Sequence, residues 1–316
     1  MSGYLNPWYF SVSSSPTWTE LSGAPNTNWQ DFDIVNDRTK MIGFAYDPYV
    51  STNSGVTWTG KVTTGQTYTQ DIKTRCKVST NGTYYHLFGR HSVNSGLYVY
   101  CSINSGSTFT LGNSQNSLYS GAFDTQSNGN NWAFYISQST ANSGIYRLYS
   151  TPATNVINNG GENRAAAQAL AISSDGSRVI AAGNGVIRVS NSMGTSFTDY
   201  TNSYSVLDVA SNDAGDQAIA SLSGTAYIKE STDYGASWSD NTAAGSRAFK
   251  GVCISNNGSI RLAWTVDLIL RSTDSGATWT DITFPGASSI VRCGLSDDGL
   301  TVISANNPGY PRIINF

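Results

Sequence analysis

The chain has 316 residues, of which 39% are hydrophobic and only 12% are charged, and its formal net charge is −3. No Lys/Arg cluster stands out, so the concentrated basic face that nucleic-acid binding needs is missing and we expect no nucleic-acid partner. No apolar run approaches the roughly 18 residues of a membrane-spanning helix, so we expect no membrane insertion. A surface built from Ser, Thr, Asn and Gly favours an all-β protein with many tight turns.

The N-terminal residues 1–8 show no basic segment followed by an apolar stretch, so they do not form a secretory signal peptide. We expect the protein to be made in the cytoplasm and then incorporated into a virion. The cysteines fall on predicted strands too far apart for the ~5.5 Å Cα separation of a disulfide. We therefore expect four free thiols, which fit a reducing compartment: Cys76, Cys101, Cys253 and Cys293.

A short motif, Ser-x-Asp/Asn-x-Gly-x-Ser/Thr-Trp/Phe, recurs along the chain. Its last three copies begin at Ser190, Ser231 and Ser272, which gives a period near 41 residues. Such a period indicates a repeat architecture. In chain order the copies stand at 11–18 (degenerate), 51–58, 102–109, near 150–154 (degenerate), 190–197, 231–238 and 272–279.

Residues 251–292 give the clearest single repeat. Residues 251–255, 260–265, 268–272 and 278–282 read as four short strands separated by turn residues, which is the pattern of one propeller blade. A second landmark, a Ser-x-Asx-Gly turn between the first two strands, recurs in step with the motif at 79–82, 128–129, 173–176, 212–215, 255–258 and 296–299, with a degenerate copy at 35–38.

Both landmarks count to seven, so the sequence predicts one domain over 1–316, a single seven-bladed β-propeller of four-stranded blades. The motif at 11–18 has no inner strands before it, and the turn at 296–299 has no motif after it. We therefore expect residues 8–21 to pair with residues 293–316 in one blade, which closes the ring and removes an exposed sheet edge.

The motif resembles the Asp-box of bacterial-neuraminidase-type repeats, and the chain resembles Asp-box β-propellers over nearly its whole length. That family includes sialidases, xyloglucan-active hydrolases, sortilin-type receptors, photosystem assembly factors and phage tail proteins, and the resemblance concerns the scaffold only. It implies structural roles, with the Asx side chain capping its turn and the aromatic ring packing between sheets, for Asn53, Gly55, Trp58, Asn104, Gly106, Phe109, Gly194, Phe197, Asp233, Gly235, Trp238, Asp274, Gly276 and Trp279.

Function in a propeller concentrates on the loops that join strand four to the next strand one and strand two to strand three. On these loops we predict ligand-binding residues with aromatic or charged side chains: Trp29, Tyr46, Arg90, His91, Arg164, Arg247 and Tyr310. With only two histidines a multi-His metal site is excluded, and we expect no metal and no cofactor.

The leading interpretation is a non-enzymatic recognition or structural propeller, namely a virion or cell-surface binding, adhesion or decoration protein. Its expected partner is a glycan or a protein, with other virion proteins among the candidates. An alternative is a glycoside hydrolase, sialidase-like, which needs two carboxyl groups about 5–10 Å apart. Its candidate carboxylates are Glu162, Asp47 and Asp267. A further alternative is an assembly factor for a membrane complex, as the photosystem relatives imply.

Overall fold

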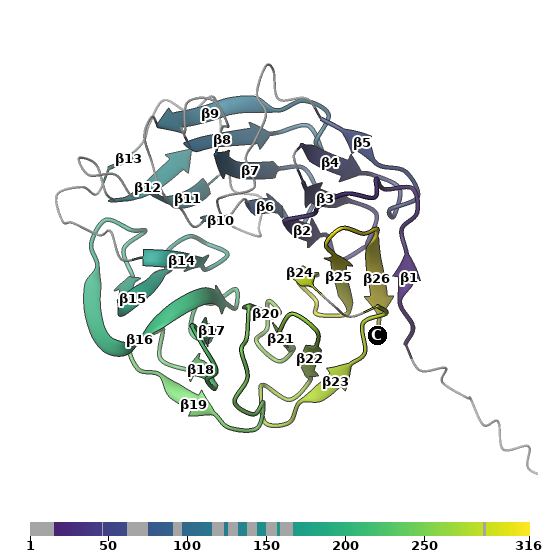
Figure 1. Ribbon diagram of the computed structural model, residues 1–316. Helices are drawn as coiled ribbons and strands as arrows, with labels where there is room; N and C mark the ends of the chain where they lie inside the picture. Colours follow the sequence, from purple (N-terminus) through teal and green to yellow (C-terminus); the bar gives the residue numbers. More distant parts are fainter. Residues whose placement is uncertain are drawn as a thin grey trace, which may run out of the picture.

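The computed structural model describes residues 16–45, 47–61, 75–90, 97–115, 123–125, 132–137, 144–149, 157–158, 167–286 and 289–316. The described elements are all β-strands, and the sheets stand around a common centre to form a ring (Figure 1). This is the architecture of a β-propeller, and the predicted all-β propeller class is confirmed. Within the described residues no helix has the length and apolar character to cross a membrane.

The described strands form six antiparallel sheets, five of which are four-stranded blades. In hydrogen-bonding order these blades are β2 (Asp31–Ile34), β3 (Met41–Phe44), β4 (Pro48–Ser51) and β5 (Thr59–Gly60); β6 (Arg75–Val78), β7 (Tyr85–Arg90), β8 (Leu97–Ser102) and β9 (Thr110–Gln115); β10 (Phe123–Thr125), β11 (Trp132–Ser137), β12 (Gly144–Tyr149) and β13 (Ile157–Asn158); β20 (Gly251–Ile254), β21 (Arg261–Trp264), β22 (Ile269–Ser272) and β23 (Thr280–Ile282); and β24 (Ile290–Leu295), β25 (Thr301–Asn306), β26 (Pro311–Asn315) and β1 (Thr19–Glu20).

The prediction of seven four-stranded blades is wrong, because the sixth sheet has six strands. It comprises β14 (Ala167–Ile172), β15 (Val179–Ser190), β16 (Thr198–Ser211), β17 (Ala218–Leu222), β18 (Ile228–Ser231) and β19 (Ser239–Asn241). The sequence predicts two separate blades over this stretch. In the structure β16 continues through the expected inter-blade loop, pairing with β15 at its start and with β17 at its end.

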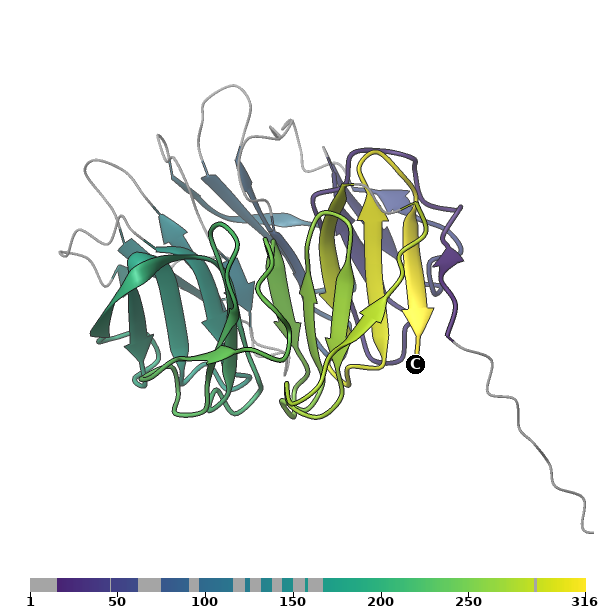
Figure 2. The same cartoon turned by 60° about the horizontal axis from the view of Figure 1, so that its bottom comes forward.

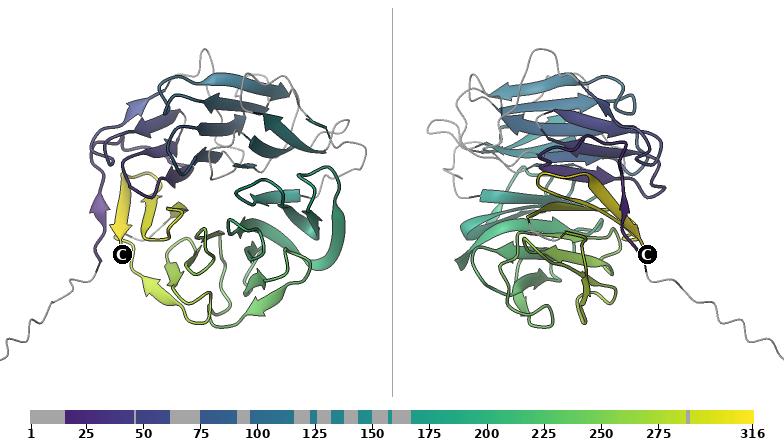
Figure 3. Two further views of the ribbon diagram at one scale, coloured as in Figure 1. Left: turned by 180° about the vertical axis from the view of Figure 1, so that it is seen from behind. Right: turned by 45° about the vertical axis from the view of Figure 1, so that its right-hand side comes forward.

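The two ends of the described chain lie in the same blade. Thr19 pairs with Ile313 and Glu20 pairs with Arg312, so β1 is the outermost strand beside β26. Figure 3 shows these two strands, purple and yellow, from behind and obliquely. Arg312 and Glu20 also form an ion pair across the same two strands, with 2.6 Å between Nη2 and Oε2. The N-terminal segment thus covers an edge that β26 would otherwise expose.

The hydrophobic core lies between neighbouring sheets. One cluster joins Val35, Ile42 and Phe44 from the β2 blade to Tyr85 and Leu87 from the β6 blade. Aromatic residues of the repeated motif border such clusters: Trp58, Phe109, Trp238 and Trp279 each pack against one of them. Clusters of this kind attach the β2 blade to the β6 blade on one side and to β25 and β26 on the other.

The motif hairpins share one hydrogen-bond pattern. In the last copy the Gly276 amide donates to Ser272 Oγ (2.8 Å), the Thr278 amide donates to Asp274 Oδ1 (2.9 Å), and Trp279 Nε1 donates to the Gly276 carbonyl (3.1 Å). The hydrogen bonds of Asp274, led by those from Thr278, lower its pKa to about 2. Equivalent Gly-to-Ser bonds of 2.8–3.0 Å occur at Gly55, Gly106, Gly194 and Gly235. The side chains of the motif therefore stabilise their own turns.

Candidate functional site

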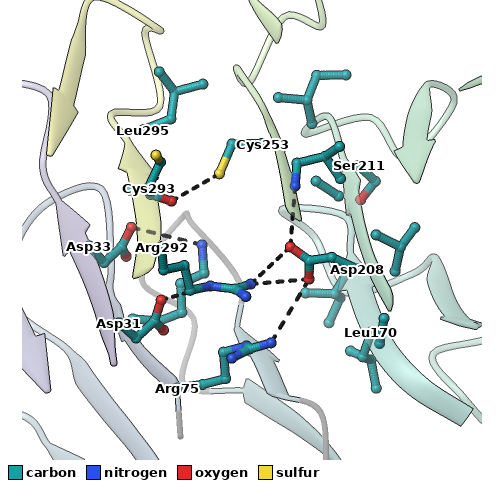
Figure 4. A pocket seen from close by; sticks show the side chains of 18 of the residues that line it. Asp31, Asp33, Arg75, Leu170, Asp208, Ser211, Cys253, Arg292, Cys293 and Leu295 are labelled. Carbon is teal, nitrogen blue, oxygen red and sulfur yellow. Dashed lines mark hydrogen bonds and ion pairs between the residues drawn. The ribbon is translucent and has the colours of Figure 1, made fainter. Parts of the chain in front are cut away.

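The centre of the ring holds a polar pocket of about 120 Å³, shown in Figure 4. Its walls come from the first strands of the sheets, including β2, β6, β20 and β24, together with the end of β16. Because side chains alternate along a strand, residues two apart point to the same side. Asp31 and Asp33 on β2, and Arg75 and Lys77 on β6, both follow this spacing and line the pocket.

Arg292 is the hub of an ion-pair network in this pocket. Its Nε lies 2.8 Å from Asp31 Oδ1, and its Nη2 lies 3.1 Å from both carboxylate oxygens of Asp208. Arg75 Nη2 lies 4.0 Å from Asp208 Oδ1. Burial disfavours the charge of Arg292, but the carboxylates of Asp208 and Asp31 outweigh it and raise the Arg292 pKa above its ordinary value. Three elements distant in sequence, β2, β16 and β24, are thereby joined across the centre.

The two aspartates also accept backbone hydrogen bonds from the next sheet. Asp31 Oδ2 accepts the Cys76 amide at 2.9 Å, and Asp208 Oδ2 accepts the Val252 amide at 3.3 Å. Each carboxylate thus bonds both a guanidinium and a neighbouring first strand. Hydrogen bonds and opposite charge compensate for the burial of these ions, so the network binds the sheets together.

A second tier of charge lies two residues further along the first strands. Asp33 Oδ2 accepts the Val78 amide at 2.8 Å, and Lys77 Nζ lies 3.8 Å from Asp33 Oδ1. Burial raises the pKa of Asp33 to about 7, against the opposing effect of Lys77, with smaller contributions from Asp297 and Asp31. Burial likewise raises the pKa of Asp297, whose Oδ2 accepts the Thr80 hydroxyl at 2.6 Å.

Sequence reasoning missed this network, although a signal was present. Asp31, Arg75, Asp208 and Arg292 all stand four residues before the turn landmark of their repeat, at Val35, Ser79, Asn212 and Ser296. An inner strand of a propeller is expected to be apolar, so opposite charges at one repeat position indicate mutual pairing. Aligning the repeats by position would have revealed it.

A second concavity, the rim pocket, lies among the loops that precede β20 and connect β21 to β22. Its lining residues are Arg247, Ala248, Lys250, Thr265, Val266, Asp267 and Leu268. Two of the predicted site residues, Arg247 and Asp267, thus come together in one pocket. Lys250 and Val266 are exposed, and Leu268 is half-buried.

Hydrogen bonds hold both loops of the rim pocket. Arg247 exchanges two backbone hydrogen bonds with Ala226, of 3.0 and 3.1 Å, and its Nε donates to the Ala244 carbonyl at 3.3 Å. In the second loop Thr265 Oγ1 donates to Asp267 Oδ1 (2.6 Å) and accepts the Leu268 amide (3.1 Å). The Lys250 amide donates to the Trp264 carbonyl at 2.7 Å, which ties the two loops together.

The other predicted site residues are dispersed. Trp29 is fully buried, with its ring against Phe32, Tyr49 and Trp58 and its Nε1 donating to the Gly309 carbonyl at 3.0 Å. It therefore lies in the core, not on the ligand face where the sequence placed it.

Asp47 lies on the β3–β4 loop and Tyr310 on the β25–β26 loop, and neither lines the central polar pocket or the rim pocket. Burial raises the pKa of Asp47. Arg90 ends β7, and its side chain is outside the described part of the structure. Tyr46, His91, Glu162 and Arg164 lie outside the described residues.

All four cysteines are free, and Cys76 and Cys293 are buried. Cys253 on β20 and Cys293 on β24 line the central polar pocket, Cys76 lies on β6, and Cys101 lies on β8. Burial raises the pKa of Cys253 to about 12, so its thiol stays protonated. Within the described residues no group of three or more His, Cys, Asp or Glu side chains is placed to hold a metal ion.

The fold defines the chain as a β-propeller. No family model matches it, and no curated protein matches it in sequence. Among solved structures it is similar to one described as YCF48 bound to D1 peptide, with a TM-score of 0.66 and 13% identity over 95% of this chain and 96% of that one. A chain of the mitotic checkpoint complex gives a TM-score of 0.62 and 13% identity over 100% of this chain and 96% of that one. At these identities the likeness shows the fold.

Proposed function

We propose that this protein is a non-enzymatic β-propeller that binds a protein partner through the rim pocket. The observation that carries the proposal is the convergence of Arg247, Lys250, Val266 and Asp267 on two loops held by hydrogen bonds. Recognition sites usually combine a few polar groups with exposed apolar surface, on loops that a rigid scaffold holds in place.

The comparisons support a protein partner over other ligands. One similar structure is described as bound to a peptide, and the other belongs to a multi-protein complex. The alternative of glycoside hydrolysis receives no such support. Its described candidate carboxylates, Asp47 and Asp267, lie on loops of different blades, and only Asp267 lines one of the two pockets. Binding of glycans, incorporation into a virion and assembly of a membrane complex stay predictions.

We also propose that the repeated hairpins are Asp-boxes with a purely structural role. Their Ser and Asx side chains are occupied by bonds within the hairpin, as at Ser231 and Asp233. Their position supports this role. The hairpins join third and fourth strands at one end of each sheet, whereas the loops of the rim pocket lie at the opposite end of the strands.

A display selection tests the proposed function. A library of random peptides is selected on the immobilised protein and counter-selected on an Arg247→Ala/Val266→Ser variant whose thermal unfolding matches that of the wild type. The proposal expects a peptide consensus that only the wild type retains. Failure to enrich any consensus, or a consensus that binds the variant equally well, would overturn it. The same immobilised protein on a glycan array decides the glycan alternative.

A further inference from the structure

The rim pocket carries more positive than negative charge, in contrast to the chain as a whole. Arg247 and Lys250 supply two positive charges and Asp267 one negative charge, whereas the formal net charge of the protein is −3. No ion pair involves Arg247 or Lys250 among the described residues. The net charge of this pocket therefore favours an acidic partner, although the chain as a whole is weakly negative.

The guanidinium of Arg247 is arranged for a carboxylate. Its Nε donates to the Ala244 carbonyl, and its backbone is hydrogen-bonded to Ala226, so the start of the side chain has a fixed position. Within the described part of the chain no hydrogen bond uses either of its Nη nitrogens. Two parallel N–H groups on one guanidinium match the two oxygens of a carboxylate.

Apolar surface lies beside these cations. Val266 is 48% exposed at the tip of its loop, and Leu268 follows two residues later. The Val266 carbonyl accepts the Ile290 amide at 2.8 Å, so the loop that presents Val266 is anchored to the first strand of the next blade. A partner that pairs with Arg247 therefore meets an apolar contact that is already in place.

Asp267 adds a restriction at the same pocket. Its Oδ1 accepts the Thr265 hydroxyl, which holds the carboxylate within the loop beside the two cations. Asp267 would repel a second acidic side chain placed next to it, because like charges close together are unfavourable. An isolated acidic residue beside an apolar one avoids this repulsion.

We infer that the partner presents an extended segment in which an acidic side chain pairs with Arg247 and Lys250 and a neighbouring apolar side chain contacts Val266 and Leu268. This inference rests on the proposed function and specifies its partner. The two loops that line the pocket lie at one face of the ring (Figure 2), where an extended chain can lie across them.

Fluorescence anisotropy with three labelled peptides tests the inference. The peptides have equal length and contain proline spacers, which keep them extended, with Leu beside Glu, Gln or Lys. We expect the Glu peptide to bind the wild type roughly tenfold or more tightly than the Gln peptide, as the loss of a charged hydrogen-bond partner implies. Raising the salt concentration should reduce this preference.

Two variants separate the inference from the broader proposal. Arg247→Gln/Lys250→Gln should remove the preference for Glu over Gln, whereas Arg178→Gln, which neutralises an arginine that stacks on Tyr234 near a motif hairpin, should retain it. Equal binding of the Glu and Gln peptides, or a preference that persists in the double variant, would overturn the inference.

The display selection decides separately whether the rim pocket binds proteins at all. A peptide consensus that has no acidic residue but needs Val266 would support the proposed function and contradict the acidic partner.

Discussion

Arg292 Nη2 lies 3.1 Å from both carboxylate oxygens of Asp208, although the two residues are 84 positions apart in the chain. The contact crosses the centre of the ring, from β24 to β16. Arg292 also reaches Asp31 on β2, so one side chain joins three elements that no single turn or hairpin connects. The stability of the ring should depend on this contact.

Asp208→Asn should lower the free energy of unfolding by about 3–5 kcal/mol, because removing one member of a buried pair leaves a charge uncompensated. Chemical denaturation followed by tryptophan fluorescence measures it. Asp240→Asn is the matched control: Asp240 pairs with Lys229 at 2.8 Å but is half-exposed, so its loss should be within about 1 kcal/mol. Equal effects of the two substitutions would contradict a structural role for the central network.

Trp29→Ala should destabilise the fold by about 3–5 kcal/mol, the usual cost of deleting a buried aromatic side chain. Its ring contacts three aromatic residues and its Nε1 bonds to Gly309. Tyr310→Ala, on a nearby loop and only half-buried, should cost much less. If the folded Trp29→Ala variant lost peptide binding while its stability were unchanged, the ligand-binding role predicted from the sequence would be right and the core role wrong.

Asp33 should make stability depend on pH between about 4 and 7. Burial raises its pKa in the folded state to about 7 from the ordinary 3.8, so across this window the folded state holds a proton that the unfolded state has released. The free energy of unfolding contributed by this group therefore falls as pH rises. Asp33→Asn cannot ionise, so its stability relative to wild type should increase from pH 4 to pH 7.

Denaturation series at several pH values measure this difference between Asp33→Asn and wild type. The Asn side chain keeps an oxygen to accept the Val78 amide, so the comparison isolates the charge. Parallel pH curves for the two proteins would show that Asp33 is ionised in the fold throughout this range.

Ser272→Ala should cost about 1–3 kcal/mol, because the Gly276 amide would lose its buried acceptor. Ser272 Oγ accepts that amide at 2.8 Å and donates to Asp274 Oδ1 at 2.8 Å. Thr273→Ala alters the neighbouring exposed position and should stay within about 0.5 kcal/mol. Thermal unfolding of the two variants side by side checks the prediction, and indistinguishable transitions would refute the stabilising role of the hairpin serine.

The sequence predicted the local features of this fold well, because they depend on residues close together in the chain. The spacing of Ser231, Asp233, Gly235 and Trp238 predicted a self-capped hairpin, and the structure has one. It did not predict that the residue before the glycine also has a left-handed backbone, as at Tyr234 with φ of 63°. Tyr carries no turn preference that would reveal this conformation.

The number of four-stranded blades and the position of Trp29 could not be predicted in the same way, because both depend on non-local contacts. The merging of two expected blades follows from β16 continuing without a break from Thr198 to Ser211. Trp29 is buried among three aromatic rings, and its indole N–H donates to the Gly309 carbonyl, 280 residues away in the chain. At the candidate site, the sequence indicated Arg247 as a ligand-binding residue and Asp267 as a candidate carboxylate. That these two residues share one pocket with Lys250 and Val266 depends on the folded loops.

Hydrogen–deuterium exchange of the protein with and without a peptide recovered from the display selection tests the central claim most directly. Binding at the rim pocket predicts slower exchange in residues 247–250 and 265–268, which form its two loops. The motif hairpins, including residues 231–238 and 272–279, should exchange as before. Protection confined to the hairpins, or to the first strands around the central polar pocket, would contradict the assignment of the rim pocket as the site of protein binding.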